Sequence, residues 1–147
     1  MTPGRGFDLQ RFMAAQDPVY ATALEDLRAG RKQSHWIWFV FPQLRGLGRS
    51  ATSEVYGLDG LAEARAYLAH PVLGPRLRES VEAMLAHRSL TASTILGGLD
   101  ALKFRSCVTL FLMAHPGDPL FATALESFFA GQRDVRTLEL LEARGAA

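Results

Sequence analysis

The chain has 147 residues, a formal net charge of +1, 48% hydrophobic and 21% charged residues, and one cysteine, Cys107. This length suits one domain with a buried core, and the near-neutral charge argues against a broad nucleic-acid or membrane surface. A lone cysteine excludes an internal disulfide, and the longest apolar run, "HWIWFVFP", is too short to cross a bilayer, so we expect a cytoplasmic protein.

Turn-forming residues and apolar spacing predict a series of short helices. We expect residues 1–6 to form a flexible tail, because Pro3, Gly4 and Gly6 discourage regular structure, and residues 7–144 to form a single helical domain. No repeat period or interdomain linker is present.

The first two helices carry recognisable start and stop signals. An apolar stripe begins at Phe7, with Asp8 placed to cap the helix or to complement its dipole. Asp17 and Pro18 have the residue types of an N-cap and a first helical position. Gly30 is expected to end the second helix.

Residues 34–41 form an apolar run whose structure periodicity alone cannot assign. Their β-branched and aromatic content suits a strand, but a lone strand has nothing to pair with. We therefore expect a short buried helix or an extended segment that Pro42 ends. A glycine-bearing loop follows, and Ser50 can cap a short helix through Tyr56.

The remaining sequence predicts further helices. They are expected over 58–70, 70–89, 101–115, 119–129 and 134–144, with a short capped turn and a loop at 91–100. Asp100 and Asp118 are placed to cap the helices that follow them. The pattern predicts an all-α fold, a compact single-domain bundle of about eight short helices.

The sequence offers no metal or cofactor motif. The four histidines do not form an HExxH motif, and the single cysteine cannot form a CxxC pair. No P-loop or GxGxxG is present, so we expect no metal and no cofactor. Cys107 lies in an apolar helical run, which is typical of an inert core cysteine.

The stretch "SHWIWFVFPQLRGLGRS", residues 34–50, is the strongest candidate for a binding segment. It holds both tryptophans of the chain, Trp36 and Trp38, which could stack on a planar ligand. Its polar and glycine positions, assigned here to ligand binding and orientation, are His35, Gln43, Arg45, Gly46, Gly48, Arg49 and Ser50. The alternative is that the aromatic residues simply form the central core.

The segment "DALKFRSCVTLF" is the second candidate. A cation in the first helical turn opposes the helix dipole, so an anionic ligand would explain Lys103. Ser106 and Thr109 are placed with it in ligand binding, and Gln16 is expected to border the same cleft. The alternative is an amphipathic helix whose polar end is solvated.

These stretches, with "EARAYLAHPVLGPRLRE" and "VRTLELL", closely resemble the bacterial domain-of-unknown-function family numbered eighteen-ten, from about Phe7 to Leu141. Lys32 and Lys103 are among its motif positions here. The resemblance implies a mainly α-helical single domain and supplies no reaction. Members are sometimes labelled calpastatin, which nothing in this sequence supports. The segment "VYGLDG" departs from the family pattern, so the entry to the next helix is expected to be looser.

A fainter likeness is to the NADAR family, small helical proteins that act on ADP-ribose-type N-glycosidic linkages. "SEVYGL" at 53–58 is similar to that family's "SEHY" segment. In that scheme Glu54 is the candidate acid/base, and His35 is the other candidate proton carrier.

The leading hypothesis is a ligand-binding or hydrolytic domain for an anionic, nucleotide-like or ADP-ribose-like small molecule. The alternative is a non-enzymatic helical module that binds a protein partner and uses the aromatic motif as core.

Overall fold

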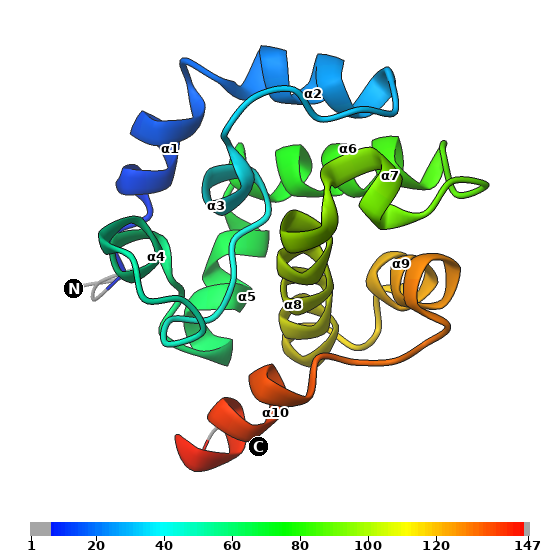
Figure 1. Cartoon of the computed structure of the whole chain (residues 1–147). Helices are drawn as coiled ribbons and strands as arrows, with labels where there is room; N and C mark the ends of the chain where they lie inside the picture. The colour runs from blue at the N-terminus through cyan, green and yellow to red at the C-terminus, as the bar shows by residue number, and fades with distance from the viewer. Residues whose placement is uncertain (1–6, 146–147) are drawn as a thin grey trace.

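Ten helices make up residues 7–145, the part of the chain that this computed structural model describes, and α8 stands near their centre (Figure 1). In chain order the helices are α1 (Gln10–Gln16), α2 (Tyr20–Arg28), α3 (Ile37–Val40), α4 (Ala51–Tyr56), α5 (Leu61–Ala69), α6 (Leu73–Leu85), α7 (Ala92–Leu96), α8 (Gly98–Ala114), α9 (Pro119–Phe129) and α10 (Val135–Ala143). The all-α class is confirmed. The expected tail at 1–6 lies outside the described residues.

Helix α8 is buried on nearly all sides because α3, α5, α7, α9 and α10 pack around it. Its central rings, Phe104 and Phe111, are fully buried, and Phe41 meets Phe104 edge to face with ring centroids 4.8 Å apart. This arrangement explains why the part of the helix from Ser106 to Ala114 is mainly apolar all round rather than striped, whereas the first turns carry charged and exposed side chains. None of the described helices is both long and apolar enough to cross a membrane.

The two helices beyond the expected eight are both very short. The apolar run at 34–41 contains α3, which has four residues, and the predicted turn at 91–100 contains α7, which has five. Elements of this length have weak local signals, and their burial against α8 decides their conformation.

Two predicted helix caps are confirmed: Ser50 and Asp118 each accept a backbone N–H of the first turn, at 3.1 and 3.0 Å. Asp134, for which no cap was predicted, accepts the backbone N–H of Thr137 at 2.9 Å. Gly30 follows α2 with a φ of 75°, which glycine adopts at little cost.

Three predicted caps are wrong. Asp17 does not cap α2, because that helix begins at Tyr20. The Asp17 carboxylate instead accepts a hydrogen bond from Arg76 at 3.1 Å. Asp8 gives α1 no side-chain cap. Asp100 lies inside the first turn of α8, so its carboxylate is free to bind elsewhere.

Candidate functional site

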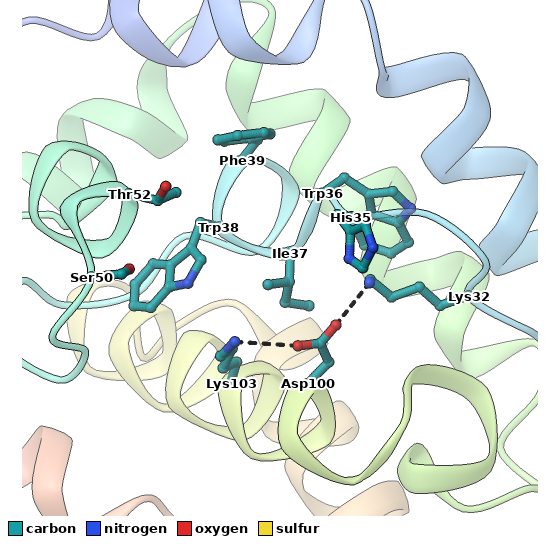
Figure 2. Close-up of a pocket in the computed structure, with 10 residues that line it drawn as sticks. All are labelled: Lys32, His35, Trp36, Ile37, Trp38, Phe39, Ser50, Thr52, Asp100 and Lys103. Atoms are coloured by element: carbon teal, nitrogen blue, oxygen red, sulfur yellow. Dashed lines mark hydrogen bonds and ion pairs between the residues drawn. The ribbon is translucent and has the colours of Figure 1, made fainter.

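A cavity of about 340 Å³ lies between the segment that includes α3, the start of α4 and the first turns of α8 (Figure 2). Its lining residues are Lys32, His35, Trp36, Ile37, Trp38, Phe39, Ser50, Thr52, Asp100 and Lys103. The volume falls within the range of small-molecule sites. We call it the lysine cavity.

The loop before α3 is held by hydrogen bonds to its neighbours. The Trp36 indole N–H donates to Asp26 Oδ2 at 3.0 Å, and the backbone N–H of Gln33 donates to the same oxygen at 3.0 Å. The backbone N–H of Lys32 donates to the carbonyl of Ile95 at 2.7 Å. These bonds fix the segment whose side chains line the cavity.

Helix α3 itself is anchored from the opposite side by Gln16. The Gln16 Nε2 donates to the carbonyl of Phe39 at 2.6 Å and to the hydroxyl of Tyr67 at 2.8 Å. Gln16 is buried and does not border the cavity, contrary to the expectation. Its role is to position α3, and therefore Trp38.

Asp100 lies between the two lysines of the chain (Figure 2). One carboxylate oxygen is 2.8 Å from Lys32 Nζ, and the other is 3.4 Å from Lys103 Nζ. The Lys32 side chain is 8% exposed and that of Lys103 is 35% exposed. Two ammonium groups facing one carboxylate leave an excess positive charge in the cavity.

Each lysine also lies over a tryptophan ring. Lys32 Nζ is 5.2 Å from the centroid of Trp36, and Lys103 Nζ is 5.9 Å from that of Trp38, both within cation–π range. Both tryptophans and both lysines of the chain therefore line one cavity. Such a site combines cations for an anionic group with flat apolar surface for a ring.

The rim of the lysine cavity carries hydrogen-bonding groups. Figure 2 shows the His35 ring on the Lys32 side and Ser50 beside the Trp38 indole. Ser50 Oγ accepts from the backbone N–H of Ser53, which leaves its hydroxyl proton able to donate. His35 is exposed, so its ring can exchange protons with a ligand or with water.

A second cavity of about 350 Å³ shares Trp38 and Lys103 with the first. Its other lining residues are Gln43, Leu47, Gly48, Leu99, Leu102, Ser106, Asp134 and Arg136. We call it the glutamine cavity.

Gly48 allows the loop to approach Trp38 closely. A Cβ at this position would lie 3.0 Å from Trp38 Cζ2 and 2.6 Å from the Cβ of Ser53, which is closer than side chains pack. The glycine therefore permits the packing of the Trp38 ring against the loop.

Eight of the predicted site residues meet at these cavities. The lysine cavity contains His35, Trp36, Trp38, Ser50 and Lys103, and the glutamine cavity adds Gln43, Gly48 and Ser106. Trp36 is 1% exposed, so it serves as core as well as wall.

The other six predicted residues lie outside both cavities: Gln16, Arg45, Gly46, Arg49, Glu54 and Thr109. Arg45 donates to the carbonyl of Glu54 at 2.9 Å and pairs with Asp59. The Glu54 side chain is 69% exposed. Gly46 adopts a φ of 105° beside Arg144.

Thr109 has a buried position that does not suit ligand binding, and Arg49 lies in the lining of neither cavity. Thr109 is fully buried; its hydroxyl donates to the carbonyl of Arg105 at 2.8 Å and accepts from the N–H of Asp134 at 2.9 Å. Thr109 therefore joins α8 to the start of α10. Arg49 is exposed on the loop before α4.

The sequence-based assignment missed Lys32, Asp100 and Thr52. A usable signal existed for Lys32, because it is one of the motif positions of the family that the sequence resembles. Asp100 was interpreted as a helix cap, and that assignment obscured its place between the lysines.

Cys107 does not take part in the site. It is fully buried, and burial raises the pKa of its thiol well above the ordinary value. A neutral, enclosed thiol is a poor nucleophile. Within residues 7–145, no three His, Cys, Asp or Glu side chains gather as metal ligands.

Comparison with known proteins places this architecture among uncharacterised relatives. The model of the family described as "Protein of unknown function (DUF1810)" matches residues 6–141. The crystal structure at 1.38 Å of the conserved hypothetical protein Rv1873 from Mycobacterium tuberculosis is 47% identical, with a TM-score of 0.90. The match covers 92% of this chain and 97% of that chain. No curated protein matches the chain.

Proposed function

The chain belongs to this family of proteins of unknown function, and we propose that it binds an anionic small molecule of the nucleotide or ADP-ribose type in the lysine cavity. The phosphate end of the ligand lies against Lys32 and Lys103, and Trp38 forms a flat wall beside it. His35 and Ser50 orient the ligand from the rim.

The observation that carries this proposal is the position of Lys103. The Lys103 ammonium lies 3.4 Å from an oxygen of Asp100, which is beyond the usual hydrogen-bond length. It also lies above the ring of Trp38. Asp100 has its shorter contact with Lys32. Lys103 is thus the less fully paired cation of the two, and a phosphate oxygen at this place would gain a charge-assisted hydrogen bond.

A hydrolytic step at this site would use His35 as its proton carrier. Its ring lines the cavity and is solvent-accessible, and an imidazole nitrogen can accept or donate a proton. Glu54 lies outside the cavity, so the proposal leaves it out of the chemistry.

A thermal-shift experiment with the pure protein tests the proposal. Pyrophosphate, ADP, ADP-ribose and NAD are each added to the wild type and to Lys103→Met. A ligand at about 100-fold its Kd should stabilise the wild type by ~2.7 kcal/mol, a rise in Tm of several degrees. We expect Lys103→Met to fold normally and to lose this rise.

The matched control is Arg88→Met, which removes a cation at an exposed position outside both cavities. It should keep the full ligand-induced rise. An absence of any rise in the wild type, or an equal rise in Lys103→Met, would contradict the proposal.

A second candidate function is protein docking, favoured by one observation. Leu99 and Leu102 lie three positions apart on α8 and are 76 and 57% exposed, and large apolar side chains exposed together can mark an interface. Self-association measured by light scattering, and its loss in Leu102→Ser, would support docking. A monomer that binds phosphate compounds would argue for the small-molecule site.

A further inference from the structure

We propose that the glutamine cavity holds the heterocyclic base of the ligand, so that the ligand is a nucleoside phosphate whose base is recognised by Gln43. This inference rests on the proposed function, because the phosphate end of the same ligand lies in the lysine cavity.

The first reason is an unpaired donor. Gln43 is 2% exposed. Of the buried polar side-chain atoms in residues 7–145, its Nε2 is the one that has no hydrogen-bond partner. Buried donors are nearly always paired, because an unpaired one loses its bonds to water and gains nothing in return. Gln43 lines the cavity, and a rotation of its amide would bring this enclosed nitrogen to an acceptor atom of a ligand.

The second reason is the composition of the walls. Leu47, Leu99 and Leu102 supply apolar surface, and Trp38 supplies a flat ring. A nucleobase has two flat faces that suit such walls and polar atoms confined to its edge. A free anion has no such face to bury.

The third reason is a hydroxyl that can accept a hydrogen bond in the same cavity. Ser106 Oγ donates its proton to the carbonyl of Leu102 at 3.2 Å, which leaves its lone pairs available. A nucleobase edge that carries both an acceptor atom and an amino group can therefore accept a hydrogen bond from Gln43 and donate one to Ser106.

The fourth reason is the contact between the two cavities. Trp38 and Lys103 line both of them. A ligand with its phosphate at Lys103 therefore has the Trp38 ring beside the rest of the molecule. This arrangement suits a base joined to a phosphate through a sugar.

Isothermal titration with paired probes tests the inference. Pyrophosphate and ribose 5-phosphate contain the anion without a base; ADP, GDP, CDP and UDP contain both. We expect at least one of the four nucleotides to bind the wild type about tenfold or more tighter than pyrophosphate. Gln43→Met should weaken that nucleotide by about tenfold and leave pyrophosphate unchanged.

The control variant is Gln132→Met, which removes an exposed amide outside both cavities and should bind like the wild type. If Gln43→Met does not fold, saturation-transfer NMR with the wild type replaces it. The base protons of the bound nucleotide should then receive more saturation than the ribose protons.

The outcomes separate this inference from the proposed function. Equal affinity for pyrophosphate and all four nucleotides, with binding lost in Lys103→Met, would overturn the base site and retain the anion site. A nucleotide preference that Gln43→Met leaves unchanged would also overturn the role of Gln43. No binding of any phosphate probe would overturn both.

Discussion

The Lys32 ammonium lies 2.8 Å from a carboxylate oxygen of Asp100, and this contact joins the loop after α2 to the first turn of α8. The two side chains are only 8 and 18% exposed, so the pair is shielded from water and salt. The same contact turns Asp100 toward the lysine cavity, where Lys103 takes its other oxygen. A single ion pair thus connects folding stability with the shape of the site.

Replacing Lys32 with Met should lower the free energy of unfolding by about 1–3 kcal/mol, because Asp100 loses its closer and more buried partner. Urea unfolding at neutral pH measures the change. Arg28→Met is the control, since Arg28 pairs with Glu79 at a position where both side chains are well exposed. That exposed pair should contribute no more than about 1 kcal/mol. Equal losses in the two variants would contradict the structural role of Lys32.

Gly48→Ala should destabilise the protein by about 1–3 kcal/mol and change the environment of Trp38. The added methyl group would meet Ser53 at 2.6 Å and the Trp38 ring at 3.0 Å, so one of them must move. Tryptophan fluorescence and thermal unfolding report the two effects. Gly117→Ala, where a Cβ has open space, should leave the fluorescence unchanged. An unaltered spectrum in Gly48→Ala would show that the loop does not support the ring.

Local signals were enough to predict the helical class and the starts of α4, α9 and α10. Ser50 and Asp118 form caps within their own segments, so their residue types sufficed. Asp17 shows the limit of such signals. It has the residue type of a cap, but its carboxylate pairs with Arg76, which is 59 positions away.

The site could be predicted only in part for a similar physical reason. Lys103 was identifiable because the sequence predicted a cation in the first turn of its helix, which needs an explanation. The structure begins α8 at Gly98 and so places Lys103 in the second turn. Lys32 and Asp100 are brought together by tertiary contacts, because α7 packs on α8 and the Lys32 N–H donates to the carbonyl of Ile95 in α7. Arg45 was placed in the site by its neighbours in sequence, but Asp59 and Glu54 hold it outside.

Cys107 should not react with a thiol reagent such as DTNB at pH 8 while the protein is folded. The thiolate is the reactive form, and burial raises the pKa of this thiol, so the folded protein holds little thiolate and shields the sulfur. Colour development should therefore be slow in buffer and complete in concentrated urea. Rapid labelling of the folded protein would contradict a buried position for Cys107.

The stability of the protein should fall above pH 10, partly because of Tyr67. Burial raises the pKa of Tyr67 far above its ordinary value of 10.0, and its hydroxyl accepts a hydrogen bond from Gln16. The raised pKa means that the folded state keeps the phenol proton while the unfolded chain loses it. The stabilisation is therefore complete below pH 10 and decreases above it, by about 1.4 kcal/mol for each pH unit.

Tyr67→Phe isolates this contribution, because it removes the ionisable hydroxyl and retains most of the buried ring. At pH 8 we expect the variant to be less stable than the wild type by about 1 kcal/mol, the loss of one hydrogen bond, since Gln16 still donates to Phe39. Between pH 10 and pH 11.5 the wild type should lose stability faster, and the difference should shrink and then reverse. Urea unfolding across this range measures both. Parallel curves for the two proteins would mean that Tyr67 ionises in the folded state as readily as in the unfolded chain, which is incompatible with its burial between α1 and α8.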